Sequence, residues 1–198
     1  MNNYSIMYFG SLMNWDLITN FLSMHLVSWL LFLVMLANYV RTSNIHASFS
    51  VRAERKEVLS LSIVMCFSYA LMIPIEFLVG LFEISSRYFP YTFFLFLDIL
   101  TILLICFLIK LQSNKALLCK RYIVFCLLCN SILFLSLQID LLLMYNNFKP
   151  FKAWWFWDVF TIGINFFDAV MILVLLIHKD LLMLNRLLLH RKKSKAVL

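Results

Sequence analysis

The sequence predicts an all-α polytopic membrane protein: a bundle of five transmembrane helices with the N-terminus outside and the C-terminus in the cytoplasm. Three observations predict this class. Of the 198 residues, 64% are hydrophobic and only 14% are charged, whereas soluble domains carry about 25% charged residues. Five stretches are long and apolar enough to cross a bilayer, which takes about 20 residues per helix. The basic residues are concentrated in the connections on one side.

The five predicted spans form one transmembrane domain over residues 21–177. The first span contains no charged residue, and each of the others contains one or two carboxylates. The bounds of the spans are 21–40, 58–82, 89–109, 122–145 and 154–177. Strands of an outer-membrane barrel would alternate in polarity over about 10 residues, so runs this long and uniformly apolar indicate helices.

Two short segments flank the spans. Residues 1–20 have no basic region at their start, so we expect an interfacial segment on the outer face rather than a signal peptide. Residues 178–198 are predicted to form a basic cytoplasmic helix that continues the last span, because no glycine or proline follows Ile177. From the end of the last span into this predicted helix, apolar residues follow a 4-3-4 spacing that is typical of a short coiled-coil seam: Ile177, Leu181, Leu184 and Leu188.

The distribution of basic residues predicts the orientation. Four lie in the 41–57 connection, four in 110–121 and six in the tail, whereas the opposite side holds only Arg87, Lys149 and Lys152. Cytoplasmic connections are enriched in Lys and Arg. The tail is therefore expected in the cytoplasm and the N-terminus outside. The net charge of +7 then reflects membrane topology before any binding partner.

Polar groups within the spans are the candidate functional residues, since ionisable side chains in a bilayer are costly. The candidates are Glu76, Asp98, Asp140, Asp158, Asn165, Asp168 and His25. Asp98 and Asp168 are expected within about 3 Å of the membrane midplane, at the helical rise per residue. No Lys or Arg inside the spans is available to pair with these acids.

Two spans place their polar residues at helical spacing. The fifth span carries a stripe of four, namely Asp158, Thr161, Asn165 and Asp168. A similar stripe in the second span, beside Pro74, consists of Ser62, Cys66, Tyr69 and Glu76. We expect both stripes to face the protein interior or a wet cavity. They would form either an outward-facing acidic vestibule for cations or protons, or neutral hydrogen bonds between helices, worth about 0.6–2 kcal/mol each.

The sequence contains no signature of a common enzyme class. It lacks a G-x-S-x-G elbow, an H-E-x-x-H zinc pair and a glycine-rich phosphate loop. The four histidines are dispersed along the chain. We therefore expect a non-enzymatic protein without a cofactor and without a metal site.

The end of the tail is the candidate partner-binding region. Its cationic residues are Arg186, His190, Arg191, Lys192, Lys193 and Lys195. They would bind anionic lipid headgroups, each charge contributing about 1 kcal/mol, or dock an acidic cytosolic effector. The leucine-rich seam before them would be buried by a partner or by another copy of the chain. No direct contact with nucleic acid is expected.

These features favour a non-enzymatic sensor or anchor subunit of a bacterial inner membrane, which relays a membrane signal to a cytosolic effector. In its size, its multiple spans and its basic cytoplasmic face, the chain resembles the membrane subunit of Kiwa-type anti-phage defence systems. That resemblance implies a homo-oligomer that works with a cytosolic DNA-binding effector. Two alternatives are an oligomeric proton or cation channel that uses Glu76, Asp98 and Asp168, and an immunity protein against a pore-forming toxin.

Overall fold

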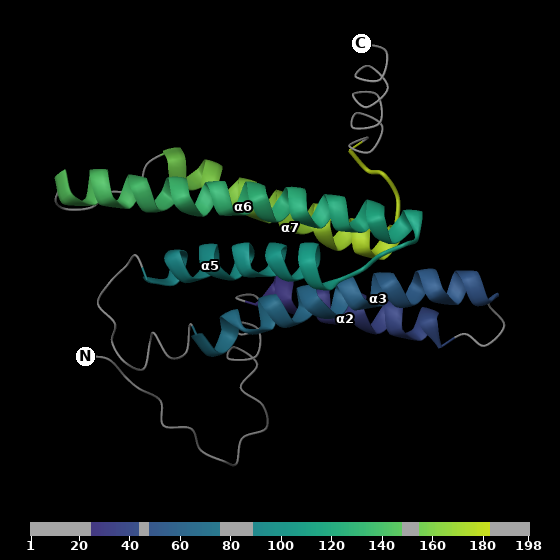
Figure 1. Ribbon diagram of the computed structural model, residues 1–198. Helices are drawn as coiled ribbons and strands as arrows, with labels where there is room; N and C mark the ends of the chain where they lie inside the picture. The colour runs from purple at the N-terminus through teal and green to yellow at the C-terminus, as the bar shows by residue number, and fades with distance from the viewer. Residues whose placement is uncertain (1–24, 44–47, 76–88, 148–154, 183–198) are drawn as a thin grey trace, which may run out of the picture.

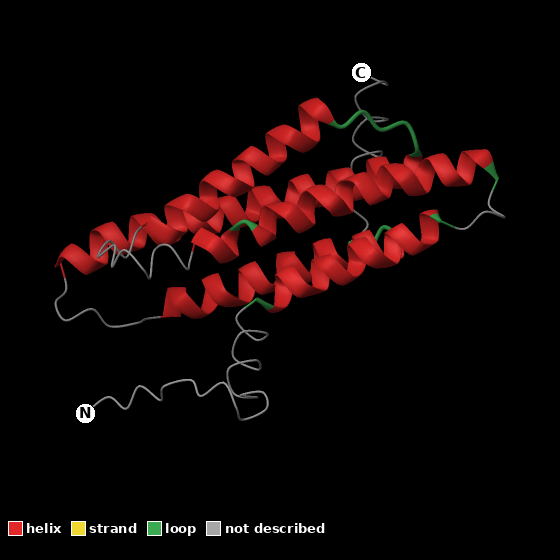
Figure 2. Cartoon of the chain, turned by 90° about the horizontal axis from the view of Figure 1, so that it is seen from below, coloured by secondary structure: helices red, strands yellow, loops and turns green. Residues whose placement is uncertain are grey.

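The computed structural model describes residues 25–43, 48–75, 89–147 and 155–182, most of which are helical (Figure 1). In chain order, the helices are α2 (Leu26–Thr42), α3 (Phe49–Ala70), α5 (Phe89–Leu103), the π-helix η1 (Leu104–Leu108), α6 (Asn114–Asn147) and α7 (Trp155–Ile177). Within these ranges there is no β-strand (Figure 2). The predicted all-α fold is confirmed for this part of the chain.

Four helical segments are long and apolar enough to cross a membrane: Phe49–Ile75, Tyr91–Leu108, Asn114–Asp140 and Trp155–Ile177. They correspond to the second to fifth predicted spans. The described part of the first predicted span, α2, is a shorter apolar helix of 17 residues. Large apolar side chains also lie on the outside of the bundle, with Phe49 at 89% and Phe107 at 77% exposure. Such an apolar exterior fits a multi-pass membrane protein better than a soluble one.

The helices run side by side and alternate in direction (Figures 1 and 2). Helix α2 packs against α3 and α7, α6 packs against α5 and α7, and α3 contacts both α5 and α6. The ends of α2, η1 and α7 therefore meet the starts of α3 and α6. We call this end of the bundle the basic end, because its described residues include Arg41, Arg52, Arg55, Lys56, Lys110, Lys115, Lys120, Arg121 and Lys179.

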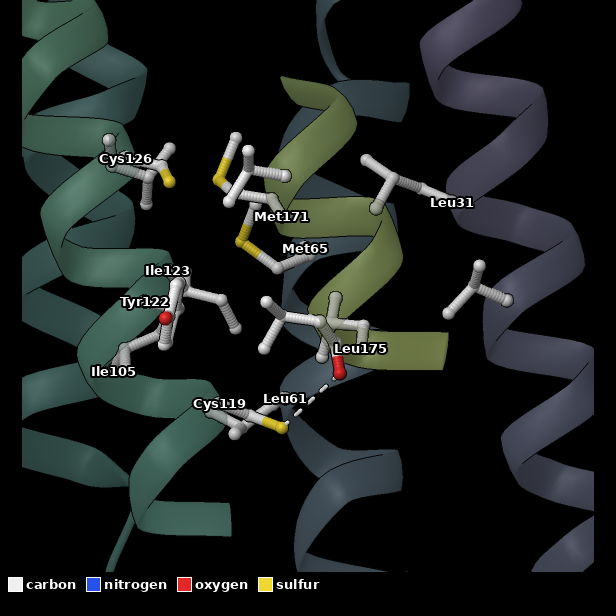
Figure 3. Close-up of a cluster of buried hydrophobic side chains, with 14 of the residues drawn as sticks. Leu31, Leu61, Met65, Ile105, Cys119, Tyr122, Ile123, Cys126, Met171 and Leu175 are labelled. Carbon is white, nitrogen blue, oxygen red and sulfur yellow. Dashed lines mark hydrogen bonds between the residues drawn. The ribbon is translucent and has the colours of Figure 1, made fainter. Parts of the chain in front are cut away.

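The hydrophobic core lies between α2, α3, α6 and α7 (Figure 3). Leu61 and Met65 from α3 meet Met171 and Leu175 from α7, and all four are almost completely buried. Cys119 from α6 packs into the same cluster, where its thiol donates to the carbonyl of Val174 over 3.7 Å. Burial of this kind contributes about 1.5–3 kcal/mol per large side chain in water; inside a bilayer, close packing of the side chains is the main stabilising term.

Two helices begin earlier than the sequence predicts. Helix α3 begins at Phe49 rather than at residue 58, and α6 begins at Asn114 rather than at residue 122. The predicted bounds followed apolar runs, but polar first turns are also helical when the backbone N–H groups at the helix start have hydrogen-bond acceptors. Glu57 is such an acceptor at the start of α6, because its carboxylate accepts from the amides of Gln112 and Ser113 over 3.1 and 2.9 Å. A carboxylate at a helix N-terminus is favourable for the helix dipole.

The third predicted span ends in a π-helical segment that the sequence does not signal. Lys120 from α6 reaches the carbonyls around η1, and its ammonium donates to those of Ile105 and Cys106 over 2.7 and 3.3 Å. Carbonyls at the end of a helix have no partner within it. The cation therefore satisfies them and holds the end of η1 against α6.

Asn38 and Arg41 connect three helices near the basic end. The Asn38 amide donates to the Ser62 hydroxyl over 2.8 Å and to the Leu175 carbonyl over 3.0 Å. Arg41 donates to the Leu176 carbonyl over 2.7 Å and to the Asn38 side-chain oxygen over 3.2 Å. A guanidinium at the last carbonyls of α7 is favourable for its dipole. These bonds hold the ends of α2 and α7 together.

The prediction of a tail helix continuous with the last span is wrong at residues 178–182. Helix α7 ends at Ile177, and His178 has a φ of 59°. Tyr122 holds the chain that follows, because its hydroxyl donates to the Asp180 carboxylate over 2.5 Å and accepts from the Leu182 amide over 2.7 Å. We call residues 178–182 the hook. The seam from Ile177 to Leu188 is thus broken at Leu181, while Arg186, His190, Arg191, Lys192, Lys193 and Lys195 lie outside the described residues.

Candidate acidic cavity

A partly open cavity of about 270 Å³ lies between the helices, and α2, α3, α5, α6 and α7 all contribute to its wall. Its polar lining consists of His25, Ser28, Tyr69, Tyr91, Asp98, Asn130, Asn165 and Asp168. The remaining lining residues are aliphatic or aromatic. Four of the seven predicted intramembrane candidates therefore meet at one cavity, which makes it the candidate functional site.

Asp168 is the most highly connected acid of the cavity. It is 5% exposed, and its Oδ1 accepts from the Tyr69 hydroxyl over 2.6 Å and from the Asn130 amide over 2.8 Å. Tyr69 comes from α3 and Asn130 from α6, so one carboxylate oxygen joins three helices. Hydrogen bonds to a buried carboxylate offset part of the cost of removing it from water.

Asp98, from α5, lies in the same wall without such support. It is 1% exposed, and neither of its carboxylate oxygens has a hydrogen-bond partner. The side-chain oxygen of Asn130 is likewise buried and unpartnered. Each unpartnered buried acceptor costs about 1–3 kcal/mol, and more when it is charged. The wall therefore holds three oxygen acceptors for which these helices supply no donor.

The packing of α5 against α3 keeps Asp98 in the wall. One turn after Asp98, the Thr101 hydroxyl lies 2.6 Å from the Ser68 hydroxyl of α3. The Thr101 hydroxyl also donates to the Leu97 carbonyl over 2.7 Å, which fixes its position on α5. Because Thr101 and Asp98 are three residues apart, they share a helix face, and this contact turns that face toward α3.

Aromatic rings line the cavity one to two turns from Asp98 and Asp168, toward the starts of α5 and α7, and they form a continuous series of contacts. Phe94 and Phe134 have ring centroids 5.8 Å apart, and Phe134 and Phe160 have centroids 5.6 Å apart. Tyr91 continues the series, with its ring centroid 6.1 Å from that of Phe160. These distances are in the range of favourable aromatic pairs. The four rings thus brace one another from α5, α6 and α7.

Of the other predicted candidates, two line the cavity and two do not. His25 and Asn165 line the cavity, and the exposed Asn165 amide donates to the Thr161 carbonyl over 2.7 Å. Asp140 is half-buried and Asp158 is exposed, and neither is part of the cavity lining. Glu76 lies outside the described residues. The predicted inward stripe of the fifth span is therefore wrong for Asp158 and Thr161, which are exposed and lie in the first two turns of α7.

Two residues of the site are absent from the predicted candidates. Tyr69 was placed on the polar stripe of the second span, but its role as a donor to Asp168 was not predicted. Asn130 gave a weaker signal, as a lone amide in an otherwise apolar stretch of the fourth span. An amide at such a position is costly in lipid unless it forms hydrogen bonds between helices. This cost is the feature of the sequence that indicates a buried partner for Asn130.

Chemically, the cavity presents acceptors, and its lining contains no Lys or Arg; His25 is its one side chain that can take up a positive charge. Two carboxylates and one amide oxygen would stabilise a proton or a positively charged ligand. Among the residues that the structure describes, no group of three His, Cys, Asp or Glu side chains could hold a metal ion. No family model, no curated protein and no solved structure matches the chain.

Proposed function

We propose that this chain is a non-enzymatic membrane sensor whose input is the neutralisation of the Asp98–Asp168 pair by a proton or a cation. The observation that carries the proposal is the burial of the Asp98 carboxylate without a partner for either oxygen. Ionisable groups within a bilayer are rare and commonly functional. A carboxylate in this position has to be neutral or to face a cation, so its environment changes with the occupancy of the cavity.

The helices that carry the site also carry the hook. Asn130 and Tyr122 both belong to α6, eight residues or about 12 Å apart along the helix. Asp168 lies nine residues before Ile177 on α7, which is about 14 Å. A small displacement of α6 against α7 at the cavity would therefore reach the Tyr122–Asp180 bond. This connection supports a relay from the membrane to the segment that precedes the basic tail.

The proposed orientation places the basic end in the cytoplasm of a bacterial cell, with the cavity on the other side of the hydrophobic core. The nine Lys and Arg residues of the basic end support it, since cytoplasmic connections are enriched in these residues. The tail would then dock a cytosolic effector, and copies of the chain would associate in the inner membrane. Removal of residues 186–198 is expected to abolish effector binding.

The test of the relay measures the hook while the cavity is titrated. The full chain in lipid nanodiscs is followed by hydrogen–deuterium exchange at Leu182 as the pH or the concentration of Na⁺, K⁺ or benzyltrimethylammonium is changed. We expect the protection factor at Leu182, which corrects for the intrinsic pH dependence of amide exchange, to respond to the cations in the wild type and to lose this response in Asp98→Asn. The response to pH, to which His178 of the hook contributes in both proteins, is expected to be smaller in Asp98→Asn. Asp158→Asn is the matched control, because it makes the same substitution at an exposed acid. Equal responses in all three proteins would contradict the relay.

A second candidate function is conduction of protons or cations by an oligomer. The observation that favours it is that acids from two helices, Asp98 and Asp168, line a partly open cavity. Flux into proteoliposomes distinguishes the two functions. A channel predicts wild-type flux that falls in Asp168→Asn and Asp98→Asn, whereas a sensor predicts no flux and an intact response of the hook.

A further inference from the structure

We infer that the ligand of the cavity is a small organic cation, with an ammonium group held by Asp98 and Asp168 and an apolar body held by the aromatic wall. This inference rests on the proposed function and deepens it by naming the class of ligand. Three features of the cavity carry it: the unpartnered acceptors, the volume and the series of rings.

The unpartnered acceptors favour a donor that carries a positive charge. Asp98 offers two oxygens and Asn130 one, all buried and without hydrogen-bond partners. Asp168 is held in place from α3 and α6 by Tyr69 and Asn130. An ammonium group placed here would meet fixed acceptors from α5, α6 and α7. The free-energy cost of removing these acceptors from water is already part of folding, so it does not oppose the binding of a cation.

The volume separates an organic cation from a bare ion. A cavity of about 270 Å³ is far larger than the roughly 10–15 Å³ of such space that one water molecule needs. Ca²⁺, for comparison, takes 6–8 oxygen ligands at about 2.3–2.6 Å, and a single dehydrated ion would leave most of this cavity unfilled. A ligand with an apolar body fills the space and excludes water from the carboxylates.

The aromatic wall fits a cation of this kind. Tyr91, Phe94, Phe134 and Phe160 all line the cavity, and they contact one another in series at centroid distances of 5.6–6.1 Å. Aromatic faces attract ammonium groups within about 6 Å, and aromatic cages recognise quaternary ammonium compounds in this way. The carboxylates lie deeper along the helices and the rings lie nearer the starts of α5 and α7, so the cavity has a charged inner part and an apolar outer part.

The proposed entrance lies on the side away from the basic end. Tyr91 is two residues from the start of α5, and His25 immediately precedes α2, so the cavity extends to the starts of these helices. The core cluster closes the opposite direction, with Met65, Met171 and Leu175 nearly fully buried between the cavity and the hook. A ligand would enter from the outer side and displace helices rather than pass through them.

Isothermal titration calorimetry on the full chain in detergent tests the inference with benzyltrimethylammonium as the probe. Benzyl alcohol is the uncharged comparison, and NaCl and KCl are titrated separately at matched ionic strength. We expect saturable binding of benzyltrimethylammonium alone, weakened at least tenfold in Asp98→Asn and severalfold in Phe134→Leu. Asp158→Asn should bind like the wild type, and circular dichroism checks that each variant is folded.

The outcomes separate this inference from the function on which it rests. If only Na⁺ or K⁺ binds, or if the hook responds to pH and to no organic cation, the ligand class is wrong and the sensor proposal stands. If neither pH nor any cation changes the hook or binds the cavity, both are wrong. Should Asp98→Asn fail to fold, Phe134→Leu and the comparison of charged with uncharged probes in the wild type decide the question. Equal binding of benzyl alcohol would also overturn the inference.

Discussion

Substitution of Tyr122 by Phe removes a single hydroxyl and tests the hook most sharply. That hydroxyl donates to the Asp180 carboxylate over 2.5 Å and accepts from the Leu182 amide over 2.7 Å. A hydrogen bond contributes about 0.5–1.5 kcal/mol to stability, and one to a charged group about 1.5–3 kcal/mol. Because the hook is partly exposed to water, we take the low end of both ranges and expect a loss of about 2 kcal/mol.

This loss has a measurable consequence at one amide. At about 1.4 kcal/mol per factor of ten, 2 kcal/mol corresponds to a roughly 30-fold larger equilibrium constant for local opening. We expect exchange of the Leu182 amide to accelerate by about that factor in Tyr122→Phe, while the helix interiors are unchanged. Tyr39→Phe is the control, because Tyr39 is exposed on α2. Unchanged exchange at Leu182, or the same acceleration in the control, would refute the role given to Tyr122.

Three further predictions concern the packing and the pH response. Asn38→Leu should lower the midpoint of thermal unfolding in detergent, since it removes two hydrogen bonds between helices, to Ser62 and Leu175, at about 0.6 kcal/mol each; an unchanged midpoint would contradict their contribution. In Gly163→Ala the new Cβ would lie 2.8 Å from Leu133 Cδ1, so we expect a modest loss of stability, and a smaller loss when the same substitution is made in Leu133→Ala. Burial, and then the charge of Arg41, lower the pKa of His178. Stability should therefore decline as the pH falls through about 6.5, where the unfolded chain takes up the proton, and His178→Gly should show a smaller decline in pH-dependent melting.

The fold class and the helices were predictable because their signal is local. Each span is a run of about 20 apolar residues, and the structure places helices at all five, with four of span length. The early starts of α3 and α6 were not predictable from hydropathy. They depend on polar turns such as the one that Glu57 caps, and these turns belong to helices that extend beyond the apolar runs.

The end of α7 could not be predicted for a different reason. No glycine or proline follows Ile177, so the local sequence favours continuation of the helix. The break at His178 is instead stabilised by Tyr122, more than 50 residues away, through Asp180 and Leu182. A tertiary contact of this kind overrides the local preference and leaves no pattern in the segment itself.

The candidate site was predicted in part. The cost of ionisable groups in a bilayer singled out Asp98 and Asp168 individually. Their meeting at one cavity depends on which faces of α5 and α7 turn inward, and the polar stripe on α7 reaches the cavity at Asn165 and Asp168 but not at Asp158 and Thr161. Tyr69 and Asn130 matter because they donate to Asp168, and pairing between helices is not visible in one sequence.

Infrared difference spectroscopy of the full chain in lipid tests the central claim most directly, because it observes the carboxyl groups themselves. The sample is titrated with pH and then with benzyltrimethylammonium, and the carbonyl band of protonated, buried carboxylic acids is followed. We predict that this band changes on titration, that the cation diminishes it, and that Asp98→Asn removes the change while Asp158→Asn retains it. A band that responds to neither titration, or that responds equally in Asp98→Asn, would contradict the assignment of Asp98 and Asp168 as the sensing pair.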